Sequence, residues 1–176
     1  MRRFVDAWNH NNYCVPAAHI APLCECIEAL FPWRLIVRRP DLVGYRLGDD
    51  LNRGAVYLRP TAAAAALHAL LGRLRDSEPE LDGAIRALEA QAADLNDHQG
   101  LRLGRIGEWE ERVARAETLA RTRPDLAVTV VRVERPGDPG TVTDYLYQAW
   151  IRLALLGPFR NTWELQALDP AKEPVR

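Results

Sequence analysis

The feature that most limits how this chain can fold is a pair of apolar runs near the C-terminus, joined by a short segment of turn-forming residues. Residues 148–168 read QAWIRLALLGPFRNTWELQAL, and the joint is GPFRN at residues 157–161. Pro158 fixes its own φ near a value that turns require, and Asn161 tolerates the left-handed region. The stretch therefore predicts a β-hairpin whose arms are the two apolar runs.

The second arm alternates apolar and polar residues, as a strand with one buried face does. One face carries Trp163, Leu165 and Ala167, and the other carries Thr162, Glu164 and Gln166. Glu164 lies in the middle of the polar face, and acidic residues are depleted in strands. Two interpretations stay open: Glu164 binds a ligand, or it forms an ion pair with Arg152 or Arg132 on a neighbouring strand.

Composition narrows the class of protein. The chain has 176 residues and is 48% hydrophobic, so it can bury the core of one domain or of two small modules. Its formal net charge of −1 gives no general attraction to nucleic acid or to an anionic membrane. The N-terminus lacks the apolar core of a secretory signal, and the longest apolar run, at residues 62–67, is too short to span a bilayer. These features predict a soluble cytoplasmic protein that binds neither nucleic acid nor membrane.

Two further features of the composition concern cysteine and arginine. The three cysteines all precede residue 27 and are odd in number, so they do not form a disulfide framework. Lys172 is the only lysine among 23 basic residues, and such an arginine-rich chain is typical of a GC-rich bacterial genome.

Periodicity and turn signals place the elements of the N-terminal part. We expect an edge strand at residues 4–8 and a loop at 9–16, then a helix at 17–31 and strands at 33–39, 42–47 and 55–58. Thr61 is the expected N-cap of an alanine-rich helix, and a capping box at residues 77–80 starts a second helix. The core stripe of the first of these helices would be Leu67, Leu70, Leu71 and Leu74.

In the C-terminal part we expect a strand at residues 101–106, a helix at 108–121, a strand at 126–134 and a loop at 135–144, followed by the hairpin. The strand at 126–134 is apolar on both faces at its start, so we expect it in the middle of its sheet. The predicted fold class is α+β, with two βαβββ-like modules joined by a helical connector. The boundaries are residues 1–60 for the N-terminal module, 61–98 for the connector, 99–168 for the C-terminal module and 169–176 for a charged tail.

This order of elements, ending in GPFRNTWEL, resembles the second module of the vicinal oxygen chelate superfamily, which includes glyoxalases, bleomycin-resistance proteins and extradiol dioxygenases. That module often ends in D-P-x-G-N-x-W-E-L. The chain keeps Pro158, Asn161, Trp163, Glu164 and Leu165 of this motif and lacks its Asp and its Gly. The helical segment at residues 113–117 is also similar to the module helix, and together the resemblance covers residues 100–168.

The resemblance implies a cup-shaped site in which the last-strand glutamate, here Glu164, points inward and binds a metal or a ligand. The other metal ligands of that superfamily usually lie at the starts of the modules' first strands and at the end of the fourth strand. The strand expected from Leu101 does not begin with histidine, since His98 is expected in a turn, and neither Phe4 nor Tyr57 is a usual ligand. A catalytic metal needs about three protein ligands.

The resemblance therefore favours the metal-free branch of the superfamily, which sequesters an aromatic or cationic drug, and it implies either a small-molecule binding protein or a metal-light enzyme of this type. A divalent metal as cofactor lacks a full ligand set. The residues expected to line the ligand site are Glu164, Arg152, Trp150, Trp163 and Tyr57. The tryptophans could equally be core residues.

A second candidate metal site lies near the N-terminus. Cys14, His19 and Cys24 are spaced like part of a zinc knuckle, and thiolate with imidazole suits zinc. The knuckle's glycines are missing and Cys24 falls on the apolar stripe of its helix, so ordinary buried or surface cysteines are the simpler interpretation. A nucleophile formed by Cys14 with His19 stays a third interpretation.

The alternative to a ligand-binding protein is an adaptor or a subunit of a complex. Its alanine-rich helices and an arginine-bearing strand, with Arg34, Arg38 and Arg39, would then contact a protein partner, which could be a second copy of the chain. An apolar stripe on the connector wider than one helix can bury would favour this alternative.

Overall fold

A computed structural model of the chain describes residues 10–47, 54–90, 98–141, 143–157 and 161–172. The chain divides into two compact units, Met1–Glu78 and Pro79–Arg176. Each unit is described by itself. The strand expected at residues 4–8 lies outside the described residues.

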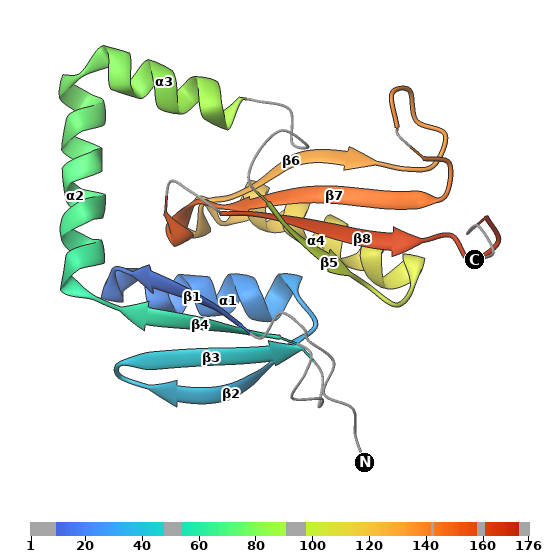
Figure 1. Ribbon diagram of the computed structural model, residues 1–176, viewed down its shortest axis with the longest axis horizontal. Helices are drawn as coiled ribbons and strands as arrows, with labels where there is room; N and C mark the ends of the chain where they lie inside the picture. Colours follow the sequence, from blue (N-terminus) through green and yellow to red (C-terminus); the bar gives the residue numbers. More distant parts are fainter. Residues whose placement is uncertain (1–9, 48–53, 91–97, 142, 158–160, 173–176) are drawn as a thin grey trace. The chain divides into compact units, whose positions relative to one another are not determined.

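The first unit contains one four-stranded sheet and two helices (Figure 1). Its elements are β1 (His10–Val15), a 3₁₀ turn (Ala17–His19), α1 (Ile20–Leu30), β2 (Trp33–Arg39), β3 (Leu42–Leu47), β4 (Ala55–Pro60) and α2 (Ala62–Ser77). The strand order is β1-β4-β3-β2, with β1 parallel to β4 and the other pairs antiparallel. The buried face of α1 packs on one side of this sheet, where the hydroxyl of the buried Tyr45 donates to Glu28 of α1 at 2.7 Å.

Burial first, and then hydrogen bonds with Cys24 and Glu28, raise the pKa of Tyr45 well above its usual value. Tyr45 therefore stays neutral and serves as a core residue that ties β3 to α1.

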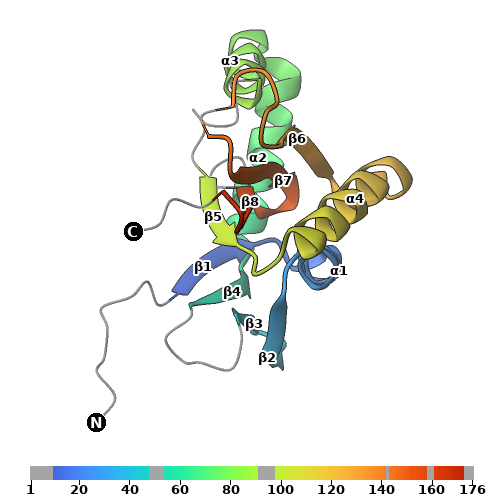
Figure 2. The same cartoon turned by 90° about the vertical axis from the view of Figure 1, so that its right-hand side faces the viewer.

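The second unit repeats the arrangement of sheet and covering helix. Its elements are α3 (Pro79–Glu89), β5 (His98–Arg102), α4 (Ile106–Thr122), a 3₁₀ turn (Pro124–Leu126), β6 (Val128–Glu134), β7 (Leu146–Leu153), a 3₁₀ turn (Ala154–Leu156) and β8 (Thr162–Leu168). The strand order is β5-β8-β7-β6, with β5 parallel to β8. Helix α4 lies along one face of this sheet (Figure 2) and buries Trp109, Val113 and Ala116.

The strands of the two sheets pair in the same register, so each position in the first sheet has a counterpart in the second. Tyr57 on β4 pairs with Gly44 on β3, and Glu164 on β8 pairs with Trp150 on β7. The edge pairs β2–β3 and β6–β7 each have one irregularity, between Leu35 and Val37 and between Val130 and Arg132, at corresponding points of the ladder. The expected α+β fold with two βαβββ-like modules is thus confirmed, although the side chains at corresponding positions differ.

Several expected elements form as the sequence indicates. The hairpin of β7 and β8 is antiparallel, with Arg152 opposite Thr162. Thr61 is the N-cap of α2, since its Oγ1 accepts a hydrogen bond from Ala64 N at 3.1 Å. None of the described helices is long and apolar enough to span a membrane.

Three expectations about strands are wrong. The Asn-rich segment expected as a loop is strand β1, and it is held at the sheet edge by parallel pairing with β4 while Tyr13 and Val15 are buried. The strand expected at 101–106 is β5 at His98–Arg102, so its start includes the expected turn. Strand β6 lies at an edge and not in the middle, because β7 pairs on its other side with β8.

Two details of turns and helices also differ from expectation. Of the hairpin joint, residues 158–160 lie outside the described part, and Asn161 is not left-handed; instead its Nδ2 donates to Gly157 O at 2.6 Å. The leucines of α2 do not form a core stripe. Ala64 is the buried residue of α2, whereas Leu67 and Leu70 are 51% and 43% exposed.

Candidate functional site

The candidate site lies on the face of the second sheet that points away from α4, which we call the open face of that sheet. Alternate residues of neighbouring strands share this face. In the row through Glu164 on β8, Gly100 of β5 lies on one side and Trp150 of β7 on the other. The adjacent row places Gln166 of β8 beside Gln148 of β7.

Glu164 is a buried carboxylate held by neutral amides. It is 4% exposed, and its Oε1 accepts hydrogen bonds from Gln148 Nε2 at 2.5 Å and from Gln166 Nε2 at 2.8 Å. Its Oε2 lies 3.3 Å from His98 Nε2. Two amide donors on one oxygen fix the orientation of the carboxyl group and leave the second oxygen directed to the β5 side.

The β5 side of Glu164 carries little side-chain bulk, because the residue opposite is glycine. A Cβ built at Gly100 would meet Glu164 Oε2 at 3.7 Å and no other atom within 4 Å. The Gly100 position therefore lies next to the second carboxylate oxygen, which also has the His98 side chain, 28% exposed, beside it.

The two arginines expected as partners of Glu164, Arg132 and Arg152, contact other groups. Arg132 forms an ion pair with the buried Glu134 and its guanidinium lies 6.0 Å from the Trp150 ring centroid. Arg152 Nη2 donates to Glu89 O at 2.7 Å. Within the described part of the chain, neither arginine pairs with Glu164, so the ion-pair interpretation of this carboxylate is wrong.

Trp150 supplies a second unusual group on the open face. It is 2% exposed, and its indole N–H is buried without an acceptor among the described residues. A buried donor without a partner costs about 1–3 kcal/mol. An acceptor brought by a ligand would recover that free energy.

Of the residues that the sequence grouped into one site, the structure places three on one face of the second sheet. Trp150, Arg152 and Glu164 share the open face. Trp163 lies on the opposite face of β8 with Leu165 and Ala167, since it alternates with Glu164, and it is a core residue at 3% exposed. Tyr57 belongs to the other unit. His98, Gln148 and Gln166 are contacts of Glu164 that the sequence did not assign to the site.

A resident metal does not fit the described residues of either unit by itself. His98 is the first residue of β5, a position where the resembled superfamily has a ligand, and with Glu164 it makes two ligands of the roughly three required. No group of three His, Cys, Asp or Glu residues among those described could hold a metal ion.

The N-terminal cysteines also lack a metal-binding arrangement. Cys14 is exposed on β1, whereas Cys24 is buried on α1. The ring of His19 lies edge-on to that of His68 at 5.1 Å. Among the described residues, Cys14, His19 and Cys24 therefore do not come together as a set of zinc ligands.

Comparisons with known proteins bear on the fold. No family model matches the sequence, and no curated protein matches it. The structure is similar to that of a glyoxalase/bleomycin resistance protein/dioxygenase family enzyme from Burkholderia phytofirmans PsJN, with a TM-score of 0.51 and 13% identity, over 93% of this chain and 100% of that chain. This similarity shows that the chain has the fold of that enzyme, which is the fold that the sequence resemblance implies.

Two more distant structures carry the same or a related description. A glyoxylase/bleomycin resistance protein/dioxygenase domain from Frankia sp. EAN1pec has a TM-score of 0.48 and 10% identity, over 97% of this chain and 95% of that one. A bleomycin-binding protein from Streptomyces verticillus, complexed with copper(II)-bleomycin, has a TM-score of 0.40 and 13% identity, over 96% of this chain and 100% of that one.

Proposed function

We propose that the chain is a small-molecule binding protein whose C-terminal unit holds its ligand on the open face around Glu164. The observation that carries this proposal is a buried carboxylate whose Oε1 is oriented by two amides and whose Oε2, beside His98, pairs with no arginine among the described residues. Burying a carboxylate is costly unless it is paired and hydrogen-bonded, so a ligand that brings a further donor or a cation to Oε2 is favoured. The proposed ligand therefore carries a cationic or strongly donating group.

The neighbouring groups suit a flat, polar ligand. Its donor would bind Glu164 Oε2 over Gly100, where a side chain is missing. The indole N–H of Trp150 would donate to an acceptor on the ligand once a side-chain adjustment exposes it. Arg152 lies in the next row of the same strand and would limit the site at that end. Binding by these groups requires no metal.

Thermal unfolding with a panel of aromatic amines and guanidines tests this proposal. A compound present at a concentration 100 times its Kd for the wild type adds about 2.7 kcal/mol to the free energy of unfolding. Glu164→Gln keeps an oxygen for the two glutamine amides but removes the charge, so we expect the variant to fold and to lose this stabilisation. Glu111→Gln is the matched control, because Glu111 is exposed on α4 and pairs there with Arg115.

The two variants separate the proposal from its alternatives. Stabilisation that survives Glu164→Gln places the ligand elsewhere. Stabilisation that is lost equally in Glu111→Gln reflects the net charge of the protein and not a site. A panel in which no compound stabilises the wild type contradicts the proposal.

The exposed leucines of α2 favour a second candidate function, contact with a protein partner. Leu67 and Leu70 lie three residues apart, as neighbours on one helix face do, and both are largely exposed. Apolar side chains grouped on a helix are typical of contact surfaces. A second copy of this chain is the partner that can be tested without further assumptions.

Sedimentation analysis of the wild type and of a Leu67→Glu/Leu70→Glu double variant tests this function. A wild-type dimer that dissociates in the double variant is the expected result, because two carboxylates would be buried in the interface. Arg73→Glu, at an exposed position of the same helix, is the control. A monomeric wild type over the micromolar range would contradict self-association.

A further inference from the structure

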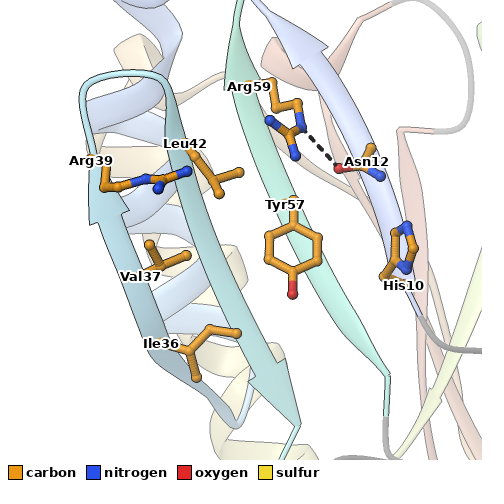
Figure 3. A pocket seen from close by; sticks show the side chains of 8 residues that line it. All are labelled: His10, Asn12, Ile36, Val37, Arg39, Leu42, Tyr57 and Arg59. Carbon is orange, nitrogen blue, oxygen red and sulfur yellow. Dashed lines mark hydrogen bonds between the residues drawn. The ribbon is translucent and has the colours of Figure 1, made fainter.

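The open face of the first sheet, which points away from α1, has a hollow of its own. Its volume is about 530 Å³, and side chains from all four strands of that sheet line it (Figure 3). The backbone pairing makes this face the counterpart of the open face in the second unit, since Tyr57 occupies the position that Glu164 occupies there. The chemistry of the two faces is nevertheless different.

Cationic groups gather at one end of this hollow. Arg39 on β2 and Arg59 on β4 flank Leu42 on β3, and Figure 3 shows the two guanidinium groups at the same end. Strands two apart in a sheet are about 10 Å from each other, a span that two arginine side chains can close around one anion. No carboxylate is among the described residues that line the hollow.

The described partners of these arginines do not neutralise the hollow. Arg59 Nε donates to Asn12 Oδ1, a neutral acceptor, at 3.3 Å. Arg39 Nε lies 3.4 Å from Asp41 Oδ1, but the two side chains are 57% and 70% exposed. An exposed ion pair of this kind contributes little and is readily exchanged for a better acceptor.

Away from the arginines the hollow is lined by apolar and aromatic side chains together with His10 of β1, whose ring lies edge-on to that of Tyr57 at 5.7 Å. Val37 and Tyr57 lie beyond the arginines, and Ile36 is 40% exposed beside them. The Tyr57 ring lies over Gly44, where a Cβ would come within 2.7 Å of the ring. A glycine on the central strand thus makes room for an aromatic ring that lies along the sheet, which is a surface on which another flat ring can stack.

We propose that this hollow binds an organic anion: a carboxylate, sulfonate or phosphonate head held between Arg39 and Arg59, and a flat apolar body against Tyr57 and Ile36. Guanidinium groups bind such oxyanions through paired N–H donors. The site lies wholly within the first unit and is independent of the proposed site around Glu164. Its ligand class is of the opposite charge.

Isothermal titration with 2-naphthoate tests this inference, with 2-naphthamide as the uncharged probe of the same shape. A molecule of about 13 non-hydrogen atoms that uses its atoms with ordinary efficiency binds with a Kd of about 1 mM. We expect saturable binding of naphthoate near that value and at least about tenfold weaker binding of naphthamide, because the amide lacks the charge that strengthens hydrogen bonds to arginine.

Three variants locate the binding. Arg59→Gln, at an exposed position, is expected to weaken naphthoate binding at least about tenfold without loss of the fold. Arg38→Gln is the matched control, because Arg38 is the exposed neighbour of Arg39 on the other face of β2, where it pairs with Glu28. Glu164→Gln should leave naphthoate binding unchanged, which keeps this test separate from that of the second unit.

Three outcomes would overturn the inference. They are the absence of saturable naphthoate binding in the low millimolar range, equal affinity for naphthoate and naphthamide, and equal weakening by Arg38→Gln and Arg59→Gln. Circular dichroism of each variant confirms that a loss of binding is not a loss of structure.

Discussion

Replacing Trp109 with alanine is expected to lower the free energy of unfolding of the C-terminal unit by about 3–5 kcal/mol, the range for removal of a buried large aromatic side chain. Trp109 is fully buried on α4 and packs edge-on against Tyr147 of β7 at 5.3 Å. Its indole N–H also donates to Leu165 O of β8 at 2.9 Å. One side chain thus joins the helix to two strands, and urea unfolding measures the loss.

Trp109→Phe is the control that separates packing from hydrogen bonding. Phenylalanine keeps most of the ring and loses the N–H, so we expect a smaller cost than for alanine, with the hydrogen bond contributing about 0.5–1.5 kcal/mol. Hydrogen exchange should show increased opening of β7 and β8 in the alanine variant. An alanine variant within about 1 kcal/mol of the wild type would mean that α4 is not anchored by this residue.

Replacing Gly44 with alanine is expected to destabilise the N-terminal unit by about 1–3 kcal/mol, the usual cost of overpacking. A Cβ at this position would lie 2.7 Å from Tyr57 Cδ1 and 2.8 Å from Val37 Cγ1, which is closer than van der Waals contact allows. The Tyr57 ring, the Val37 side chain or the strand between them must move. The midpoint and slope of a urea unfolding curve measure the effect.

Gly72→Ala is the matched control and should change stability in the opposite direction. Gly72 lies within α2, and a Cβ there meets nothing within 4 Å. Alanine is favoured over glycine in a helix by about 0.8–1.0 kcal/mol, so this variant should gain stability. In a Gly44→Ala/Tyr57→Ala double variant, part of the loss should be recovered relative to the sum of the single variants. If the loss of stability in the double variant equals the sum of the losses in the two single variants, the Tyr57 ring is not what the new Cβ meets.

The hairpin at the C-terminus could be predicted from sequence because its signals are local. Alternation of Trp163, Glu164 and Leu165 fixes which side chains share a face, and turn residues mark where the chain reverses. The position of β5 could not be predicted in this way. His98, Gln99 and Gly100 are typical of a turn, and they form a strand because their backbone groups pair with β8, which is distant in the sequence.

From the sequence, the internal repeat could be predicted only from the order of helices and strands in the two units. Corresponding positions of the two sheets carry Tyr57 and Glu164, Arg39 and Glu134, and Leu42 and Gln148. Backbone hydrogen bonding sets the register and places few demands on the side chains of an open face. The repeat is therefore preserved in the ladder while the chemistry of the two faces differs.

The candidate site was predictable only in part, for a related reason. The period of two placed Glu164 on a polar face, and Trp150 and Arg152 lie on the same side across the hairpin. The glutamine contacts of Glu164 depend on the register between β7 and β8, and the contact with His98 depends on the true start of β5. Local sequence specifies neither. The inclusion of Tyr57 in that site stays a prediction, because Tyr57 belongs to the other unit.

Glu164 and the two glutamine amides that orient it form the proposed ligand site. Side-chain NMR of these amides is the most direct test of that site. The ¹⁵N-labelled protein would be titrated with an amine or guanidine that stabilises the wild type, while the NH₂ signals of Gln148 and Gln166 and the indole signal of Trp150 are followed. We predict that these three signals shift together and saturate with the same Kd, and that the Trp163 indole on the opposite face does not follow them. Saturable shifts confined to Trp163 and α4, with the two amides unchanged, would contradict the account.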